Sequence, residues 1–179
     1  MKRRVVLTAK EMELIETRMT AQIVERHPDP ACLILAGIKR RGEDLAARLA
    51  ANLQKIYNAS VAFGAIDINL YRDDWTRLSG EIPHIGVSSL PFSIDDKEVI
   101  LVDDVLFSGR TVRSAISALL DYGRPKKIEL LVLVDRGHRE LPICPDYTGL
   151  RLETSRDDQV SARLRERDGE DIVYISSPD

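Results

Sequence analysis

Hydrophobic residues at helical spacing predict an amphipathic helix near the start of the chain. They recur every three or four positions, at Met12, Ile15, Met19 and Ile23. Just before them, Thr8 and Glu11 form the Thr-x-x-Glu pattern typical of a capping box at a helix start. Because a proline disfavours helical backbone in the residue before it, we expect this helix to end near His27-Pro28.

Short apolar runs then alternate with further helical patterns. Strands are predicted at residues 31–36, 61–70, 99–102 and 128–134, and helices at residues 45–56 and 111–122. The apolar positions change phase between Ala65 and Ile66, which predicts a bulge near Gly64. Such alternation indicates an α/β fold with a mostly parallel sheet and right-handed crossovers. Near the end of the chain, the pattern predicts a hairpin of residues 160–164 and 172–175 that turns near Asp168-Gly169.

One long stretch, residues 71–96, has little periodicity. It carries charges, prolines, Gly80 and Gly86. An irregular segment of this length in a compact domain is typical of a functional flap or a disordered segment. The chain shows no repeat, low-complexity tract or change of composition that would mark a domain boundary, so we expect one domain over residues 1–179.

Composition narrows the class of protein. With 179 residues, 44% of them hydrophobic and 31% charged, the chain resembles a soluble globular domain. No apolar run approaches the roughly 20 residues of a membrane span, and Val5-Val6-Leu7 is too short for a signal-peptide core, so a cytoplasmic location is expected. The net charge of −3 argues against nonspecific nucleic-acid binding driven by bulk charge. Cys32, expected in the core, and Cys144, expected on a loop, match no disulfide or metal framework.

The segment from Val99 to Thr111 carries the most specific chemistry. Four aliphatic residues deliver Asp103 and Asp104 to the carboxyl end of a strand, where open α/β sheets bind ligands. The loop that follows opens a helix, so its amides, hydroxyls and helix dipole are suited to a phosphate. This loop comprises Val105, Leu106, Phe107, Ser108, Gly109, Arg110 and Thr111. The two carboxylates are placed to accept hydrogen bonds from sugar hydroxyls; the alternative is an acidic strand end with an ordinary helix cap.

This thirteen-residue string resembles the signature that binds phosphoribosyl pyrophosphate (PRPP) in type I phosphoribosyltransferases. The resemblance implies the fold of that family, a mostly parallel sheet flanked by helices, with a flexible flap and a small hood. A second motif, which matches the pyrophosphate loop of the family, comprises Gly37, Lys39, Arg40 and Arg41. Its basic side chains suit a leaving group that gains negative charge as the C1–O bond breaks, although a basic turn alone is usually solvated surface.

A third motif, Asp67 to Asp74, resembles the start of the flap that closes over PRPP. Closure would exclude water from a reactive oxocarbenium-like centre. Arg72 is the candidate in this segment to meet the pyrophosphate, and we expect it to act with Asp103 and Asp104 in catalysis.

A fourth motif, Val134 to Pro142, narrows the resemblance to one subfamily over roughly residues 17–147. This subfamily contains bifunctional pyrimidine operon regulators with uracil phosphoribosyltransferase activity. The implied reaction converts uracil and PRPP to UMP and pyrophosphate, with Mg²⁺ held mainly by the oxygens of PRPP rather than by a protein metal site. Phe107 stands where purine-specific relatives carry an aspartate. The base is expected near Asp135, Arg136 and Gly137.

The same resemblance implies a homo-oligomer, a dimer or higher, that regulates transcription attenuation by binding pyrimidine-operon leader RNA on a basic face. The matching positions are Thr17, Arg18, His138 and Arg139. However, Ala21 stands where a histidine is expected, and Cys144 and Leu150 stand where basic residues are common. Each lost phosphate contact weakens RNA binding and flattens its salt dependence.

Three readings of the function therefore stay open. The first is a uracil phosphoribosyltransferase that also regulates. The second is a UMP-sensing RNA-binding regulator with little catalytic activity. The third is a phosphoribosyltransferase for another base, such as orotate or a purine.

Overall fold

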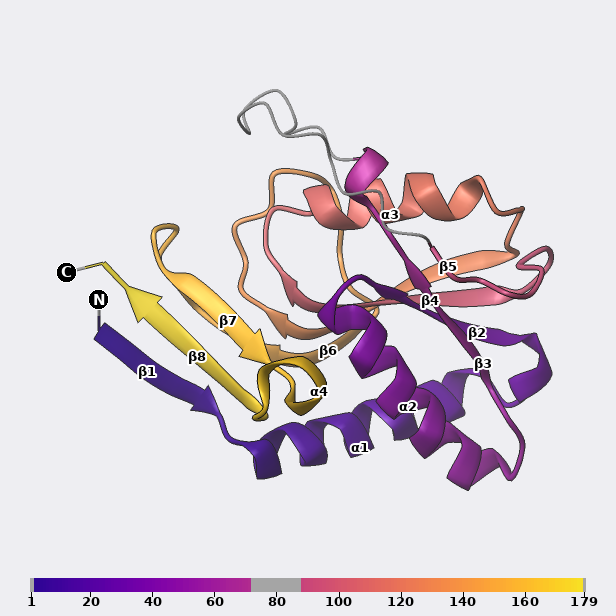
Figure 1. Cartoon of the computed structure of the whole chain (residues 1–179), viewed down its shortest axis with the longest axis horizontal. Coiled ribbons are helices and arrows are strands. Elements are labelled where there is room, and N and C mark those ends of the chain that lie inside the picture. Colours follow the sequence, from indigo (N-terminus) through magenta and orange to yellow (C-terminus); the bar gives the residue numbers. More distant parts are fainter. Residues whose placement is uncertain (1, 72–87, 179) are drawn as a thin grey trace.

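A five-stranded parallel sheet forms the centre of the molecule (Figure 1). The structure is a computed structural model that describes residues 2–71 and 88–178. The sheet has the order β3-β2-β4-β5-β6, with strands β2 (Leu33–Ile38), β3 (Ala62–Ile66), β4 (Glu98–Leu106), β5 (Lys127–Asp135) and β6 (Tyr147–Arg151). Helices α1 (Ala9–Arg26) and α2 (Arg41–Tyr57) cover one face, and α3 (Arg110–Leu120) covers the other.

Both faces of the central strands are buried, which explains their continuous apolar runs. Successive residues of β4 alternate between two cores: Ile100 and Val102 face α1 and α2, whereas Val99 and Leu101 face α3. Burial of each such side chain contributes roughly 1.5–3 kcal/mol to folding. The layered α/β fold predicted from the alternating pattern is confirmed.

A smaller antiparallel sheet, here called the hood, lies beside the main sheet (Figure 1). It has the order β1-β8-β7, with strands β1 (Lys2–Leu7), β7 (Gln159–Arg163) and β8 (Ile172–Ser177). A short helix, α4 (Arg165–Asp168), connects β7 to β8 and is counted here as part of the hood. Gly169 follows it in the left-handed region with φ of 79°. The predicted hairpin is therefore confirmed, whereas β1 and β6 were not predicted.

The first helix follows its sequence signals closely. Thr8 caps α1, its hydroxyl accepts a hydrogen bond from the Glu11 amide, and the Glu11 carboxylate accepts one from the Thr8 amide, which completes the predicted capping box. Met12, Met19 and Ile23 are all buried, as the periodicity predicts.

Three local predictions were wrong. The strand expected at 31–36 starts at Leu33, because Pro30–Cys32 forms a 3₁₀ turn that is capped by Asp29 and leaves Cys32 exposed. Strand β3 pairs with β2 without a bulge and ends at Ile66; Gly64 instead allows the close approach of the backbone of Ser89. In α2, Ile56 is exposed although the pattern placed it on the apolar face.

No helix in the described ranges, 2–71 and 88–178, is long and apolar enough to cross a membrane.

Candidate active site

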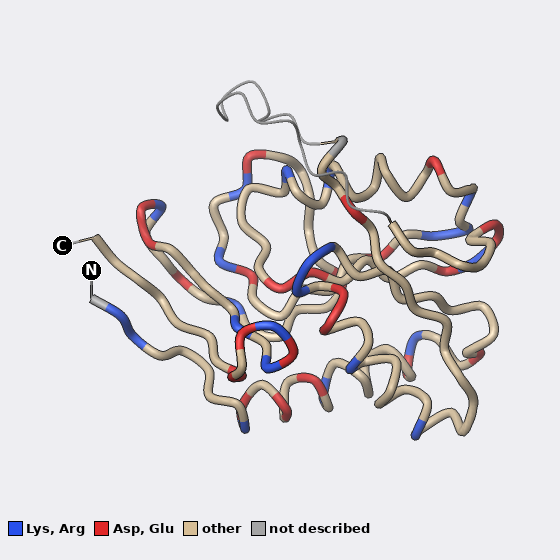
Figure 2. Tube along the Cα trace, in the orientation of Figure 1, with Lys and Arg blue, Asp and Glu red and all other residues tan. Residues whose placement is uncertain are grey.

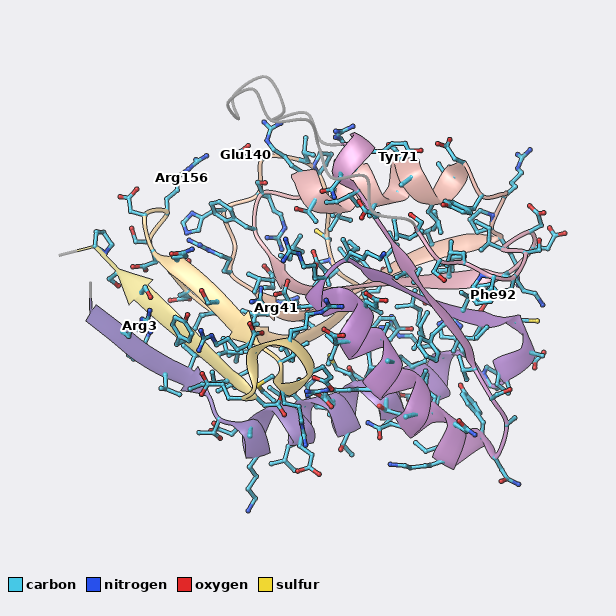
Figure 3. All side chains as sticks on the ribbon, viewed as in Figure 1. Arg3, Arg41, Tyr71, Phe92, Glu140 and Arg156 are labelled. Atoms are coloured by element: carbon cyan, nitrogen blue, oxygen red, sulfur yellow. The ribbon has the colours of Figure 1, made fainter. Side chains whose placement is uncertain are left out.

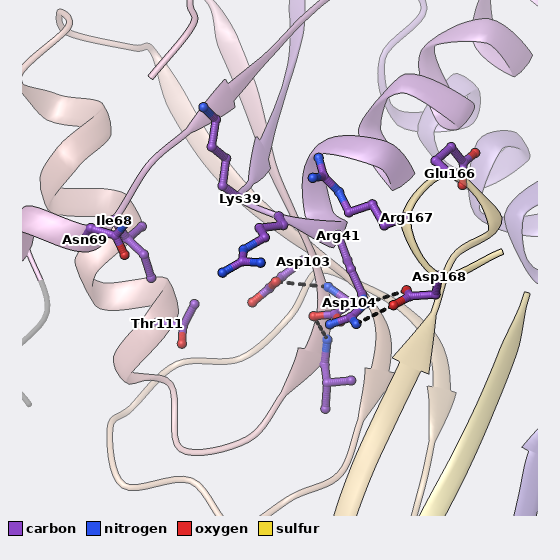
Figure 4. Close-up of a pocket in the computed structure, with 12 residues that line it drawn as sticks. Lys39, Arg41, Ile68, Asn69, Asp103, Asp104, Thr111, Glu166, Arg167 and Asp168 are labelled. Carbon is purple, nitrogen blue, oxygen red and sulfur yellow. Dashed lines mark hydrogen bonds and ion pairs between the residues drawn. The ribbon is translucent and has the colours of Figure 1, made fainter. Parts of the chain in front are cut away.

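A cavity of about 930 Å³ opens at the carboxyl edge of the main sheet (Figure 4). Four regions that lie far apart in the sequence line it: the turn after β2, the segment after β3, the end of β4 with the start of α3, and α4 of the hood. The lining residues are Lys39, Arg40, Arg41, Ile68, Asn69, Asp103, Asp104, Val105, Thr111, Glu166, Arg167 and Asp168. The fold thus brings the predicted pyrophosphate and PRPP motifs together and adds the hood to them.

Two adjacent carboxylates form the floor of this cavity. The Asp104 amide donates a hydrogen bond of 3.0 Å to Asp103 Oδ1, and the Val105 amide donates one of 2.9 Å to Asp104 Oδ1. Burial, and then the neighbouring Asp104 carboxylate, raise the pKa of Asp103 well above its usual range. Burial also raises the pKa of Asp104. A ligand that donates hydrogen bonds or brings positive charge here would relieve this repulsion.

The loop between β4 and α3 presents backbone donors rather than a capping side chain. Gly109 occupies the helix-capping position with φ of 91°, a left-handed conformation that favours glycine, and offers no side-chain cap itself. The Ser108 hydroxyl accepts a long hydrogen bond of 3.4 Å from the Arg110 amide. The Ser108 carbonyl accepts hydrogen bonds from the amides of Glu140 and Leu141, which fixes the loop from behind. The positive end of α3 beside the Thr111 hydroxyl is suited to a phosphate.

The turn between β2 and α2 is tight and basic. A Cβ atom on Gly37 would clash with the backbone of Gly42 and Glu43, so only glycine allows this close approach. The Lys39–Arg40 peptide bond is cis, and the Lys39 amide donates a hydrogen bond of 2.9 Å to the Ile66 carbonyl. Lys39, Arg40 and Arg41 all line the cavity.

Comparison with known proteins agrees with this geometry. Residues 6–163 match the model of the phosphoribosyl transferase domain. "Bifunctional protein PyrR" of Syntrophobacter fumaroxidans is 49% identical over 172 residues, which cover 96% of this chain and 92% of the relative. "Bifunctional protein pyrR" of Enterococcus faecalis is 47% identical over 176 residues, which cover 98% of each chain. The chain belongs to the PyrR branch of the phosphoribosyltransferase family.

Solved structures confirm the predicted type I phosphoribosyltransferase fold. A hypoxanthine phosphoribosyltransferase from Staphylococcus aureus superposes with a TM-score of 0.67 at 23% identity, covering 98% of this chain and 92% of that one. The hypoxanthine phosphoribosyltransferase of Trypanosoma cruzi reaches a TM-score of 0.73 at 17% identity, covering 97% and 91%. At these identities the likeness concerns the fold alone.

The loop after β5, where we expect the base, is braced by its own side chains. Asp135 accepts hydrogen bonds from Arg139 Nη2 at 2.5 Å and from the Gly137 amide at 3.0 Å. Arg136 is only 6% exposed, its guanidinium lies 4.3 Å from the centroid of the Phe107 ring, and its Nη2 donates to the Ser155 carbonyl. Asp135, Arg136 and Gly137 do not line the 930 Å³ cavity.

Glu140 extends this bracing to the loop between β4 and α3 (residues 105–111), here called the phosphate loop. Its carboxylate accepts hydrogen bonds from Arg110 Nε at 2.8 Å and from Arg156 Nη2 at 2.5 Å. Figure 3 shows Glu140 and Arg156 at the same end of the molecule; Glu140 lies on the loop between β5 and β6, and Arg156 on the loop from β6 to the hood strand β7. Movement of one of these loops would therefore disturb the others.

The four residues predicted to meet RNA all make intramolecular hydrogen bonds. Arg18 is exposed and donates to the carbonyls of Thr148 and Gly149, and the Thr17 hydroxyl donates to the Glu13 carbonyl. His138 is exposed and contacts the Thr154 carbonyl through Nε2 at 2.7 Å. The Arg139 side chain is only 20% exposed and donates to Asp135 and to the Phe107 carbonyl. Thr17, Arg18 and His138 are therefore the exposed members of this set, and Arg139 is half-buried.

The hood residues Glu166, Arg167 and Asp168 were missed by sequence reasoning. The available signal was a run of charges at 165–168 that interrupts the hairpin, which is visible in Figure 2 as alternating blue and red beside the start of α2. Arg72 lies outside the described residues, as does most of the segment 71–96 predicted as a flap. Just before this segment, Asp67 Oδ1 accepts a hydrogen bond from the Asn69 amide, and near the end of the segment Ile94 is buried in the core.

Proposed function

We propose that this cavity transfers the phosphoribosyl group of PRPP to uracil, which forms UMP and pyrophosphate. The single observation that carries the proposal is the convergence of three groups on one cavity: the uncapped start of α3, the basic turn after β2, and the buried Asp103–Asp104 pair. Each group suits one part of PRPP, namely its 5-phosphate, its pyrophosphate and its ribose hydroxyls.

In this mechanism the chain acts by positioning and electrostatics. The loop 105–111 holds the 5-phosphate, so that the ribose lies above Asp103 and Asp104, which accept hydrogen bonds from its hydroxyls. Lys39, Arg40 and Arg41 stabilise the negative charge that develops on the departing pyrophosphate as the C1–O bond breaks. No side chain forms a covalent intermediate.

The donor set also fits Mg²⁺ that arrives with PRPP. One oxygen of each aspartate accepts a backbone N–H, and this leaves the second oxygen to meet a ribose hydroxyl or a metal-bound water. Asp103 and Asp104 would thus hold the cation together with oxygens of PRPP, and the cation would supply charge neutralisation at the pyrophosphate. Within the described residues, no group of three or more His, Cys, Asp or Glu side chains is arranged for a metal.

The choice of a pyrimidine rests on Phe107 and on the relatives. The Phe107 ring packs against the Arg136 guanidinium and offers no group to accept a proton from a purine. The close relatives are PyrR proteins, whereas the hypoxanthine enzymes share only the fold.

A substrate panel tests this proposal. We expect purified protein with PRPP and Mg²⁺ to form UMP from uracil, with hypoxanthine and orotate as parallel reactions. Turnover of hypoxanthine but not of uracil would mean that the substrate base is a purine rather than uracil. Absence of turnover with every base, in protein that still binds UMP, would favour a regulator that uses the site as a sensor.

RNA-dependent regulation is a second candidate function, supported by the name "bifunctional" of the relatives and by the exposed side chains of Arg18 and His138. We expect specific, salt-sensitive binding to a pyrimidine-operon leader RNA. Arg18→Ala should weaken it for all sequences and reduce the slope of log affinity against log salt by about 1. Absence of binding at low salt would leave the enzyme without this role.

A further inference from the structure

Arg41 of the pyrophosphate turn is held by a carboxylate of the hood. Its Nε and Nη2 donate to the two oxygens of Asp168, each at 2.9 Å, which is a bidentate arrangement (Figure 4). The Arg41 side chain is 39% exposed and that of Asp168 is 14% exposed. Figure 3 shows Arg41 between the start of α2 and the hood. The contact therefore joins the two sides of the cavity.

Asp168 is itself fixed within the hood. Its Oδ2 accepts a hydrogen bond of 3.0 Å from the Leu164 amide, and its own amide donates to the Leu164 carbonyl. The bonds from Arg41 lower the pKa of Asp168 to about 2, so the carboxylate is ionised at neutral pH. Arg41 is thus held by a rigid, charged partner.

Two further sets of ion pairs hold α4 against α2. Arg167 contacts Glu43 and Asp44, and Arg48 contacts Glu166 and Asp171. A carboxylate on this turn is consequently unable to swing away from Arg41 as a free loop would.

The pair leaves most of the Arg41 guanidinium available to a ligand. A guanidinium has five N–H donors, and Asp168 accepts from two nitrogens along one edge. The other edge carries donors that bond no residue within the described part of the chain. A long arginine side chain loses roughly 1.5–2 kcal/mol of conformational freedom when it is ordered. Here folding, rather than ligand binding, orders it.

We propose that Asp168 is a positioning residue for the pyrophosphate group: it holds the Arg41 guanidinium at the cavity so that its free edge meets phosphate oxygens. This inference rests on the proposed function, because it assumes that pyrophosphate binds beside residues 37–42. It adds a hood residue that acts through Arg41 and touches neither the ribose nor the base. The simplest alternative is that Asp168 only competes with the anion for Arg41.

The two roles predict opposite results for Asp168→Asn, which keeps an acceptor for the Leu164 amide but removes the charge. If Asp168 positions Arg41, Mg²⁺–pyrophosphate should bind roughly 10- to 100-fold more weakly in calorimetry, and the KM for PRPP should rise more than the KM for uracil. If Asp168 only competes, loss of the negative charge should leave pyrophosphate binding unchanged or tighten it, and that result would overturn the proposal.

Matched variants complete the test. Glu170→Gln removes another hood carboxylate, one that pairs with Arg163 away from the cavity, and should leave pyrophosphate binding unchanged. Arg41→Ala should weaken binding at least as much as Asp168→Asn does, and the double variant should lose little more than Arg41→Ala alone, because Asp168 acts through Arg41. Additive losses would contradict the positioning role. If the asparagine variant fails to fold, Asp168→Glu replaces it, because it retains the charge but moves it on a longer side chain. Pyrophosphate binding should then weaken if Asp168 positions Arg41 and stay unchanged if Asp168 only competes.

Failure of the proposed function gives a different result. Wild-type protein that binds no Mg²⁺–pyrophosphate would refute the pyrophosphate site itself. Wild-type protein that binds it equally well with and without the Asp168 carboxylate would refute only the inference about Asp168.

Discussion

The two ends of the main sheet each carry a pair of acidic side chains that are buried or half-buried, but the fold treats the two pairs in opposite ways. At the carboxyl end, Asp103 and Asp104 face a cavity, and burial raises the pKa of both. At the amino end, Glu98 of β4 and Glu129 of β5 flank the buried imidazole of His27. One end is left open for a ligand, whereas the other is closed by the protein itself.

The closed end is a continuous hydrogen-bonded network. His27 contacts Glu98 through Nδ1 at 2.7 Å and Glu129 through Nε2 at 2.6 Å, and the Tyr147 hydroxyl donates to Glu129 at 3.1 Å. Lys126 and then His27 lower the pKa of Glu98 by hydrogen bonding. Burial opposes ionisation of Glu129, but hydrogen bonds from Lys127 and His27 lower its pKa overall. Paired in this way, the carboxylates join α1, β4, β5 and β6 at their ends.

The difference separates a stabilising use of carboxylates from a functional one. A buried charge with partners costs little, whereas one without partners opposes folding and is retained where a ligand supplies the partner. We therefore expect substitutions at the amino end to affect stability and substitutions at the carboxyl end to affect turnover.

The largest expected effect on the free energy of unfolding is at His27. His27→Ala leaves two carboxylates without their shared hydrogen-bond partner, and a buried acceptor that loses its partner costs about 1–3 kcal/mol, or more when it is charged. Urea unfolding should show this loss in the free energy of unfolding, with kcat of the remaining folded protein unchanged. Glu25→Gln, an exposed change on the same helix, is the control. A loss below about 1 kcal/mol would mean that the network contributes little.

Asp104→Asn should affect turnover instead. Removal of a well-placed polar group in an active site lowers kcat by roughly 10²–10³-fold. The melting temperature should not fall, because the lost charge is one that burial disfavours. Glu98→Gln, at the other end of the same strand, is the matched control and should reduce stability while it preserves turnover. Near-normal kcat in folded Asp104→Asn would remove this residue from the mechanism.

Sequence reasoning reached the central layers of the fold because their signals are local. The residues of the α1 capping box lie within a few positions of one another, and so do the residues of the apolar run of β4. Strand β1 escaped notice because its partner β8 lies at the other end of the chain. Strand β6, Tyr147–Arg151, is a sheet edge that contains Gly149 and has no strong alternation. Cys32 was misplaced because an apolar neighbourhood does not reveal a 3₁₀ turn.

The same distinction applies to the site. The phosphate loop and the pyrophosphate turn are contiguous motifs, so their residues could be named from the sequence. The fold places Val105 and Thr111 of the first motif, and Lys39, Arg40 and Arg41 of the second, on one cavity. The contact between Arg41 and Asp168 spans 127 residues and depends on the way the hood packs. No local pattern reports such a contact, which is why the hood residues entered only with the structure.

The smallest and most specific prediction concerns Asp103 and the pH dependence of stability. Its raised pKa means that the folded state favours the protonated side chain. Relative to the unfolded chain, this residue therefore contributes stability that is fully present below its ordinary pKa of 3.8 and is lost as pH rises through the raised value. Asp103→Asn is neutral at every pH and still accepts the Asp104 amide. Ligand-free Asp103→Asn should therefore melt above wild type at neutral pH, and the gap should close toward pH 3.8.

Glu129 provides the opposite case within the same sheet. Its lowered pKa gives stability that is present above the ordinary value of 4.5 and is lost as pH falls through the lowered one. Glu129→Gln should therefore melt below wild type at neutral pH and approach it in acid. Thermal melts of the two variants from neutral pH to about pH 3 should bracket the wild type from opposite sides and converge. If Asp103→Asn melted below wild type at neutral pH, its carboxylate would be satisfied within the protein, and the carboxyl end would not be held open for a ligand.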